Sequence, residues 1–496
     1  MNIQLPTPDI KHFVSWCLNH GGRVSETIVT DNPTDPMFPA FCNPSIFYDK
    51  KSDRFLMNLR NVSYLLQSSK QDKWGGWGPL CYNIPSSRFN WLETENYYGE
   101  VVDPIKDQWK FKKVEMKPRQ QQWEFHGLED IRIYRNLLSG TLYSIGVRRD
   151  DNPTGIGRMN AMTMDENHNE STSIKIKAPG NDTAYCIKNQ SIVTDGDHLL
   201  IDTFNPLHII RWENNGNVST AVKKPKIDGP DRAFDMLRGS SQTIPWKDGH
   251  LTIVHTCTMF YTANGRKYAR YLHFFLYYDK DWNLVKFSPM FSFNNMLVEF
   301  CCGLTQKGDN LYISFALQDN CSYVLEVPSG ALEKFLFEDV TDIYDTSIWG
   351  DNPDRSTIYQ YALRMYNEHK ISCAFTWFMY IVDNFPDIYN EWFMASRCIA
   401  DLGMRDQAEI GMWYQCMMYD RERPEAYFAI AMYYYCRGSY PEAKYWVEEG
   451  MKRQFNNPSN FYYSYLDMEK IYHQCMWQTS DYERVNTEQK LDVKAF

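Results

Sequence analysis

Charged and amide side chains recur at both ends of five segments of this sequence whose interiors resemble β-strands. In each segment a polar residue is followed by a second one 17 to 20 positions later. Carboxylates act as general acids or bases, and basic side chains bind phosphate. If these residues converge, they predict acid–base chemistry on a ligand with an anionic group. The five pairs are Asn43 and Arg60, Asp130 and Arg148, Lys188 and Asn205, Arg238 and His255, and Glu299 and Asp319.

The segments between these residues predict the scaffold that positions them. Residues 45–60 and 131–149, for example, alternate apolar and polar residues around a polar turn, which indicates an antiparallel hairpin. Five such hairpins favour a five-bladed β-propeller. In an antiparallel hairpin, the start of the first strand lies beside the end of the second strand. The polar residues at these two positions would therefore surround one mouth of the propeller. The alternative is that strand ends are polar because they meet water.

The pattern changes to helical from about residue 350. Gly403 and Gly438 are 35 residues apart, as are Ala408 and Ala443. This period, with small and aromatic residues in alternation, resembles the tetratricopeptide repeat, in which stacked helix pairs share a core. The fold class predicted is therefore multidomain β plus α. We place a propeller domain at residues 1–340 and a helical-repeat domain at residues 341–496.

Composition excludes several classes of protein. The chain has 496 residues, 43% of them hydrophobic and 23% charged, which is globular rather than disordered. No apolar run is long enough to span a membrane, and no secretory signal is recognisable. The net charge of −10 makes nucleic acid an unlikely partner. The 13 cysteines have no regular spacing. Reduced thiols and a cytoplasmic location are therefore expected.

Several of the hairpin-end residues belong to longer motifs that resemble a known family. The motifs are Phe41-Cys42-Asn43-Pro44 with Arg60, Gly127-Leu128-Glu129-Asp130-Ile131-Arg132, Lys188-Asn189, Arg238-Gly239-Ser240, His255 with Tyr268, and Glu299, Gly303 and Asp319. In this order they resemble the five-bladed-propeller β-mannoside phosphorylases and hydrolases, together with related propeller glycosyltransferases. The resemblance covers roughly residues 40–330. Ile131 departs from the proline that the family has at this position.

The resemblance implies a role for each matching residue. Asp130, with its neighbour Glu129, would be the catalytic carboxylate, acting as acid or base at the anomeric oxygen. Positive charge for a phosphate group would come from the basic hairpin-end residues, and Glu299 and Asp319 would bind sugar hydroxyls or supply a second catalytic carboxylate. The substrate- and phosphate-binding set is Asn43, Arg60, Arg132, Arg148, Lys188, Asn189, Arg238, His255, Tyr268, Glu299 and Asp319.

Three functions follow from this interpretation. A glycosyltransferase that uses a nucleotide-sugar donor and an acceptor hydroxyl is our first prediction, because the helical repeats are absent from ordinary phosphorylases. A glycoside phosphorylase or hydrolase acting on β-mannoside-type linkages is the second, with inorganic phosphate as the co-substrate of a phosphorylase. A non-catalytic scaffold that binds carbohydrate or protein is the third.

Cofactors and further partners are expected to be few. We predict no metal site: Asp195-Gly196-Asp197 fits the D-x-D pattern of metal-binding transferases, but it lies in a predicted turn, where these residues are common. A protein partner could bind the helical repeats. The only other expected partners are the sugar donor and its carbohydrate or other hydroxyl acceptor.

Overall fold

The computed structural model describes most of the chain. The described residues are 11–25, 28, 35, 37–68, 78–84, 92–117, 119, 125–152, 154–177, 179, 184–227, 234, 236–261, 266–338, 354–385, 389–404, 407–453 and 465–479. The predicted domain boundary between residues 340 and 341 lies outside these ranges.

The first three blades of the propeller follow one another along the chain. Blade 1 contains β3 (Ala40–Asp49), β4 (Arg54–Val62), β7 (Leu92–Val101) and β8 (Phe111–Lys113), with β9 (Phe125–His126) pairing to β7. Blade 2 contains β10 (Leu128–Arg135), β11 (Leu142–Arg148), β12 (Arg158–Met164) and β13 (Glu170–Lys175). Blade 3 contains β14 (Ser191–Ile192), β15 (Leu199–Phe204), β16 (Leu207–Trp212) and β17 (Val218–Lys223).

The last two blades each include a strand from the start of the chain. Blade 4 contains β18 (Arg238–Gly239), β19 (Ile244–Trp246), β20 (Gly249–Tyr261), β21 (Lys267–Asp279), β22 (Leu284–Phe287) and β23 (Phe291–Ser292), with β1 (Lys11–His12) parallel to β23. Blade 5 contains β24 (Glu299–Lys307), β25 (Asn310–Leu317), β26 (Cys321–Pro328) and β2 (Arg23–Ser25). Pairing of β2 with β26 fixes the start of the chain on the last blade. The predicted five-bladed propeller is confirmed.

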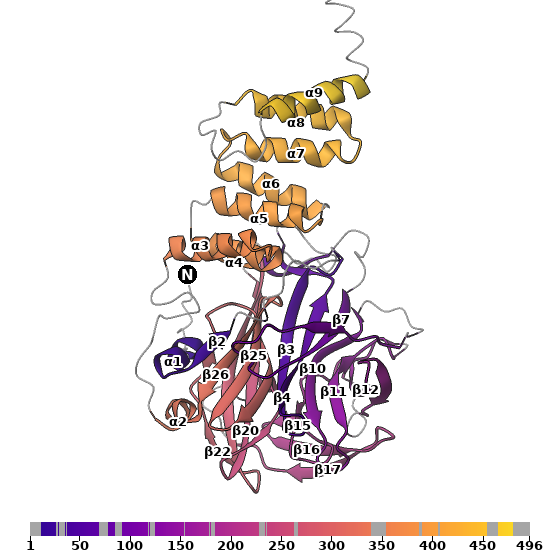
Figure 1. Ribbon diagram of the computed structural model, residues 1–496, viewed down its shortest axis with the longest axis vertical. Coiled ribbons are helices and arrows are strands. Elements are labelled where there is room, and N and C mark those ends of the chain that lie inside the picture. The colour runs from indigo at the N-terminus through magenta and orange to yellow at the C-terminus, as the bar shows by residue number, and fades with distance from the viewer. Residues whose placement is uncertain are drawn as a thin grey trace, which may run out of the picture.

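Nine helices occur in the described residues. Two pack on the propeller, α1 (Phe13–Asn19) and α2 (Ser329–Phe337), with Phe13 against Phe335. The other seven form a column beyond the propeller, with α3 and α4 nearest to it (Figure 1). They are α3 (Arg355–Asn367), α4 (Ile371–Asn384), α5 (Tyr389–Asp401), α6 (Gln407–Tyr419), α7 (Glu425–Tyr435), α8 (Tyr440–Met451) and α9 (Tyr465–Gln478). Helices after the propeller were predicted; their assignment to the tetratricopeptide class stays a prediction.

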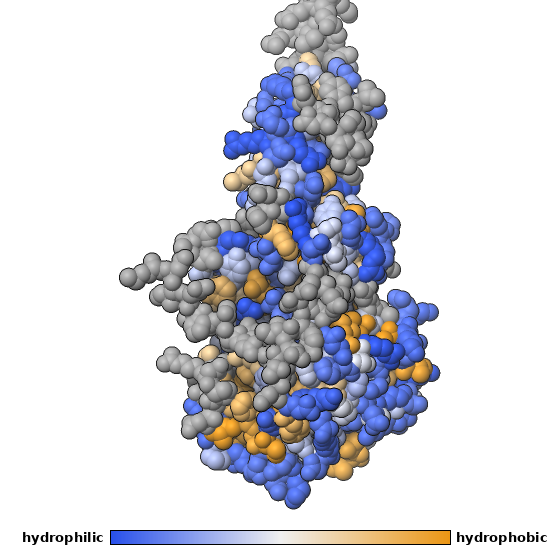
Figure 2. Space-filling model, turned by 90° about the vertical axis from the view of Figure 1, so that its left-hand side faces the viewer, coloured by the Kyte–Doolittle hydropathy of each residue, from blue (hydrophilic) through white to orange (hydrophobic). Residues whose placement is uncertain are grey.

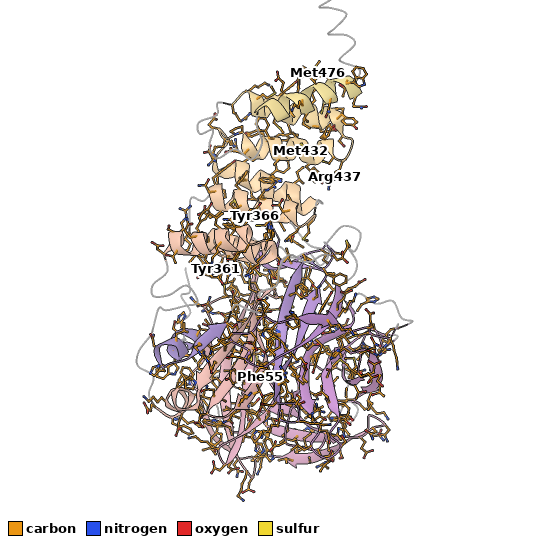
Figure 3. The ribbon with its side chains drawn as sticks, viewed as in Figure 1. Phe55, Tyr361, Tyr366, Met432, Arg437 and Met476 are labelled. Atoms are coloured by element: carbon orange, nitrogen blue, oxygen red, sulfur yellow. The ribbon has the colours of Figure 1, made fainter. Side chains whose placement is uncertain are left out.

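The helical column and the propeller share a continuous core. Tyr361 on α3 lies at the base of the column (Figure 3), and its hydroxyl is 3.3 Å from that of Tyr323 on β26. The Asn320 side chain donates to the carbonyl of Ser372 and to Thr376 Oγ1, both on α4, at 2.7 and 2.9 Å. The helices are therefore docked on the end of blade 5, beside Asp319.

None of the helices in the described ranges is long and apolar enough to cross a bilayer. Hydrophilic side chains cover much of the face in Figure 2, and the hydrophobic ones form separate patches on the propeller and the column. All 13 cysteines lie in the described ranges, and none of them is placed in a disulfide bond.

A buried glutamine joins three blades at the centre of the propeller. The Gln242 amide nitrogen donates to the Ile133 carbonyl at 2.9 Å and to the Ile46 carbonyl at 3.3 Å, and its oxygen accepts from Leu304 N at 3.0 Å. Gln242 is fully buried. Its bonds hold the inner strands β3, β10 and β24 at fixed distances from one another.

Replacing Gln242 with alanine should destabilise the protein by about 2–4 kcal/mol, because the Ile46 and Ile133 carbonyls and the Leu304 amide would each lose a buried hydrogen bond. The matched control is Gln306→Ala. That side chain lies at the propeller surface and donates only to the Gly308 carbonyl, so a change within about 0.5 kcal/mol is expected. Chemical denaturation of both variants checks this, and equal losses would contradict a structural role for Gln242.

Candidate active site

A cavity of about 220 Å³ lies at the mouth of the propeller that faces the helical column. We call this end the helix-side mouth. All five blades contribute to the wall, from the ends of their inner hairpins. The lining residues are Asn43, Arg60, Tyr64, Leu80, Tyr82, Leu92, Phe125, Glu129, Asp130, Arg149, Lys188, Asn189, Arg238, His255, Tyr271, Val298, Phe300 and Asp319. The structure thus brings Asn43, Arg60, Glu129, Asp130, Lys188, Asn189, Arg238, His255 and Asp319 together, as the sequence predicts.

Four of these residues have left-handed backbone conformations. The φ angles are 48° for Asn43, 52° for Asp130, 63° for Asn189 and 47° for Asp319. The β3–β4 and β10–β11 ladders shift register around the first two. Asn and Asp tolerate this region better than other non-glycine residues, but it remains strained and is concentrated at functional sites. The same local distortion therefore occurs in four blades and surrounds the cavity.

Gly127 begins the motif that contains Asp130, and only glycine fits there. Its φ is 92°, and a Cβ atom would lie 2.2 Å from the Thr94 carbonyl oxygen. Its amide donates to Asp150 Oδ2 at 2.9 Å. The motif is thereby fixed against blade 1 before the chain reaches Asp130.

Asp130 is a buried carboxylate held in its ionised form. Its Oδ1 accepts from Asn43 Nδ2 at 2.8 Å and from Arg60 Nη1 at 3.0 Å. Burial alone would raise the pKa of Asp130, but nearby positive charges, that of Arg60 first, outweigh it and hold the pKa below its usual range. Glu129 also faces Arg60, at 3.8 Å.

Asp319 has the opposite electrostatic environment. Its Oδ2 accepts from the Tyr64 hydroxyl at 2.9 Å. Burial and the negative charge of Asp130 raise its pKa above the usual range, against the lowering effect of Arg60. The cavity therefore holds two carboxyl groups whose pKa values are displaced in opposite directions, a pattern that separates a proton donor from an ionised partner.

Two cations at the mouth are not held in close ion pairs with described carboxylates, although the charge of Lys188 acts to lower the pKa values of Asp130 and Asp319. Lys188 and Arg238 line the cavity, and neither forms an ion pair with a described carboxylate, whereas Arg60 is paired with Asp130. Arg149 also lines it, with its guanidinium 4.2 Å from the centre of the Phe125 ring. The side-chain oxygens of Asn43 and Asn189 are buried and accept no hydrogen bond within the described part of the chain. The cavity therefore presents both cations and acceptors that a ligand can satisfy.

His255 lies in the cavity but does not carry the positive charge that we predicted for it. Its Nδ1 is 2.8 Å from Ser240 Oγ, and its ring is stacked near Tyr271. Burial, with added repulsion from His273 and nearby cations, lowers the pKa of His255 well below its ordinary value. The ring is therefore neutral at physiological pH and acts as a hydrogen-bonding group.

Arg148 does not reach the cavity, and its chain neighbour Arg149 does. Successive strand residues point to opposite faces, so an error of one residue reverses the direction. The Arg148 side chain is buried between acidic groups, 3.6 Å from Asp150, 3.9 Å from Asp151 and 3.9 Å from Glu170. Its role is structural.

Replacing each of these arginines by alanine should therefore have different effects. Arg148→Ala removes a buried positive charge beside Asp150, Asp151 and Glu170. The last two keep Arg119, at 2.7 and 2.6 Å, so the variant should destabilise the protein by about 1–3 kcal/mol. Arg149→Ala should leave stability nearly unchanged and weaken the binding of inorganic phosphate by about tenfold. Thermal unfolding and phosphate titration of both variants separate the two roles. The assignment is wrong if Arg148→Ala is the variant that loses phosphate binding alone.

Three other predicted site residues lie outside the cavity. Arg132 is buried behind it, where Nη1 donates to the Asp130 carbonyl at 2.5 Å and Nε to the Ser240 carbonyl at 2.8 Å. Glu299 is fully buried and accepts from the backbone amides of a neighbouring loop, which leaves no free oxygen for a sugar. Tyr268 lines a different cavity, between the propeller and α4. These residues position or flank the site without touching a ligand in it.

Several cavity residues were not predicted from the sequence. They are Tyr64, Leu80, Tyr82, Leu92, Phe125, Arg149, Tyr271, Val298 and Phe300. Leu80 and Tyr82 come from β6 (Gly78–Asn83), which pairs with β5 (Leu65–Ser68) outside the repeated blade pattern. The pattern that identified the hairpin ends carries no signal for this insertion. Tyr271 and Phe300 lie within strands, where aromatic residues are expected in the core.

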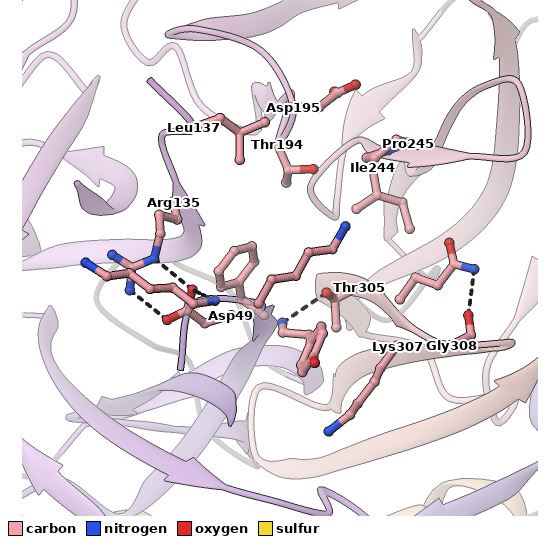
Figure 4. Close-up of a pocket in the computed structure, with 15 residues that line it drawn as sticks. Asp49, Arg135, Leu137, Thr194, Asp195, Ile244, Pro245, Thr305, Lys307 and Gly308 are labelled. Carbon is pink, nitrogen blue, oxygen red and sulfur yellow. Dashed lines mark hydrogen bonds and ion pairs between the residues drawn. The ribbon is translucent and has the colours of Figure 1, made fainter. Parts of the chain in front are cut away.

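A larger cavity, of about 590 Å³, lies at the opposite mouth of the propeller. Turns from all five blades line it, among them Asp49, Leu137, Thr194, Ile244 and Thr305 (Figure 4). Asp49 is engaged by Arg135 through two 2.7 Å contacts. Arg135 thus contributes to holding the pKa of Asp49 below its usual range, and no carboxyl group with a raised pKa lines this cavity among the described residues.

Metal-binding geometry is absent from the part of the chain that is described. No group of three or more His, Cys, Asp or Glu side chains gathers there in an arrangement that could hold a metal ion. Asp197, of the D-x-D pattern, lies 3.1 Å from Arg211 at the side of blade 3, away from the cavity.

No protein-family model and no curated protein matches the chain. Among solved structures, it is similar to a β-1,2-mannobiose phosphorylase from Listeria innocua, with 12% identity and a TM-score of 0.42 over 63% of this chain and 99% of that one. A glycosyl hydrolase from Bacteroides ovatus gives 11% identity and a TM-score of 0.40 over 58% and 84%. The translocator chaperone SycD of Yersinia enterocolitica is similar with 17% identity and a TM-score of 0.21, over 27% of this chain and 85% of that one.

Proposed function

We propose that the protein is an enzyme that cleaves or forms a glycosidic bond with phosphate, that is, a glycoside phosphorylase. The observation that carries this proposal is the pair of carboxyl groups, Asp130 and Asp319, in one cavity with pKa values displaced in opposite directions. Glycosidic bond cleavage needs a proton donor for the leaving oxygen and a negative charge to stabilise an oxocarbenium-like transition state.

The cavity walls fit a sugar ring. The unpartnered oxygens of Asn43 and Asn189 would accept hydrogen bonds from sugar hydroxyls, since a buried acceptor without a partner is unfavourable. Tyr82, Phe125 and Tyr271 provide aromatic surface for the apolar face of the ring. The neutral His255 adds one donor or acceptor.

Lys188 and Arg238 would bind the phosphate, and the charge of Arg149 in the same cavity lining would add to its attraction. A phosphate dianion forms strong hydrogen bonds with charged donors, and neither Lys188 nor Arg238 is engaged in a close ion pair among the described residues. Arg60 is also cationic and faces Asp130, so it would connect the phosphate and sugar regions of the cavity.

The reaction would then use each group once. Asp319 gives its proton to the leaving glycosidic oxygen as the bond from that oxygen to the anomeric carbon breaks. Asp130 stays ionised and stabilises the positive charge that develops on the sugar. A phosphate oxygen forms the new bond to the anomeric carbon, and the product is a sugar 1-phosphate. The reverse reaction uses the same groups.

The size of the cavity favours phosphate over a nucleotide-sugar donor, the co-substrate of our first prediction. Its 220 Å³ lies below the range of about 300–1,000 Å³ typical of small-molecule pockets, so space in it is limited. One sugar with a phosphate needs less room than a sugar joined to a nucleoside diphosphate. A hydrolase would use water in place of phosphate and has no need for Lys188 and Arg238.

Thermal unfolding in the presence of ligands tests this proposal. Inorganic phosphate should raise the unfolding midpoint, and Lys188→Ala and Arg238→Ala should abolish the rise. Lys286→Ala, a change of an exposed lysine on the outer strand β22, should keep it. A rise with a nucleoside diphosphate and none with phosphate would overturn the proposal in favour of a transferase.

A further inference from the structure

A second cavity, of about 210 Å³, lies between the propeller and the first helices of the column. Strands and loops of blades 4 and 5 form one wall, and helix α4 forms the other. The lining residues are Tyr268, Arg270, Asn295, Met296, Leu297, Gln318, Tyr380, Asp383 and Asn384. We call it the junction cavity.

Only one layer of chain separates the junction cavity from the candidate active site. Arg270, Leu297 and Gln318 line the junction cavity. The residue that follows each of them, Tyr271, Val298 and Asp319, lines the active-site cavity. Consecutive Cα atoms are about 3.8 Å apart, so the two cavities are adjacent at three separate places in the wall. Asp319, the proposed proton donor, lies on this shared wall.

Contacts beside the cavity fix helix α4 in place. Arg266, near the start of β21, is 2.8 Å from Asp383 on α4. On the other side, Asn320 donates to Ser372 and Thr376 near the start of the same helix. The far wall is therefore held to the propeller at both ends, so the junction cavity is a preformed feature rather than a gap between loosely joined domains.

The loop on the propeller side is also preorganised. The Glu299 carboxylate accepts from the backbone amides of Phe293 at 2.5 Å, Asn294 at 2.9 Å and Met296 at 2.7 Å. Asn295, in the middle of this loop, has a left-handed φ of 58° and faces the cavity. This explains why a fully buried acidic residue occurs beside the site without reaching it.

The side chains in the junction cavity have the chemistry of a neutral polyhydroxylated ligand. Asn295 and Gln318 use their side-chain oxygens internally, accepting from Arg270 Nη2 and Val298 N at 3.0 Å, so each offers its NH₂ group to a ligand. Asn384 donates to the Tyr380 carbonyl at 2.8 Å and offers its oxygen, and Arg270 Nε is buried with no partner in the described residues. Tyr268 adds aromatic surface and stacks on Phe260, whose side chain is 42% exposed on the hairpin tip. Amide groups, one orphaned donor and aromatic surface together match sugar hydroxyls and ring faces.

We propose that the junction cavity binds the outer sugar units of a glycan that leaves the active site at the helix-side mouth and passes over the edge of the shared wall. This inference rests on the proposed function and adds that the substrate is an oligosaccharide. Helix α4 thereby becomes part of the substrate site, and the helical column has a role in choosing substrates by length.

The test compares substrates of different length. The probes are p-nitrophenyl β-D-mannoside, which carries one sugar, and β-1,2- and β-1,4-linked mannobiose and mannotriose, each with inorganic phosphate. For the wild-type protein kcat/KM should rise with length. Tyr380→Ala should lower kcat/KM for the longer substrates by about tenfold, the size expected from one lost aromatic contact, and leave the one-sugar substrate unchanged. Asn384→Ala, a change of an exposed side chain, provides a second variant that does not threaten folding.

Tyr414→Ala is the matched control, since Tyr414 is an exposed aromatic residue elsewhere on the column. It should behave as the wild type with every substrate. If both junction variants keep the full gain with length, the inference is wrong while the proposed function stands. If the wild type turns over none of the probes with phosphate, the proposed function itself has failed. Equal losses for all substrates would indicate a structural defect and also contradict the inference.

Discussion

Asp130→Asn should lower turnover by about 10²–10³-fold while the protein stays folded and still binds sugar. The substitution keeps the size of the side chain and removes the negative charge that faces the proposed oxocarbenium-like transition state. Arg60 keeps a second acidic neighbour in Glu129, at 3.8 Å, so the loss of charge does not leave it without a partner. The measurement is kcat from initial rates, with thermal unfolding of the same sample as a check on folding.

Asp309→Asn is the control for this substitution. Asp309 lies in an exposed turn at the opposite end of blade 5, between β24 and β25, and its variant should be fully active. A scaffold protein would tolerate Asp130→Asn in any partner-binding assay. If the variant keeps wild-type turnover, Asp130 has no catalytic role and the site has been assigned to the wrong residues.

The activity should fall as the pH rises through the pKa of Asp319. The pKa of Asp319 is raised above its usual range, so the carboxyl group keeps its proton to a higher pH than an ordinary aspartate does. Activity is lost when this proton leaves. Asp130 must be ionised for activity. Since its pKa is lowered, activity should be lost on its account only at a lower pH than for an ordinary aspartate. The profile of kcat/KM is therefore bell-shaped, and the acidic limb belongs to Asp130.

Asp319→Asn should lower kcat by about 10²–10⁴-fold at the optimum and remove the alkaline limb from the residual activity. Saturating phosphate adds negative charge near Asp319 and should move the alkaline limb of kcat to higher pH than that of kcat/KM measured at low phosphate. Initial rates from pH 4 to 9 at both phosphate concentrations check this. An alkaline limb that persists unchanged in Asp319→Asn would assign the proton donor to another group.

The fold was predictable because the propeller repeats one local pattern. Each hairpin has its own alternation and turn, and its length sets the position of the polar residues at its ends. Asn43, Asp130 and Asn189 were found in this way, and their residue types also suit the left-handed backbone that the structure shows. The sequence could not show the strain itself, since Asn and Asp are common in turns for other reasons.

The errors came from features that depend on more than one hairpin. The sequence pattern predicted that Arg148, rather than Arg149, faces the cavity. Apolar–polar alternation does not determine the residue at which a strand ends, and a shift of one residue reverses the face. Glu299 is polar at a strand start, but a loop from before β24 occupies its oxygens. The neutral state of His255 follows from burial by neighbouring blades, and the roles of Tyr64 and Tyr82 depend on chain segments outside the repeat.

The most direct test of the central claim is to follow the fate of phosphate during turnover. The protein is incubated with β-linked manno-oligosaccharides and inorganic phosphate, and the products are observed by phosphorus NMR. A glycoside phosphorylase converts inorganic phosphate into a sugar 1-phosphate in step with cleavage, and Asp130→Asn abolishes the new signal. Release of free sugar at the same rate with and without phosphate, and no phosphorylated product, would contradict the account and identify a hydrolase.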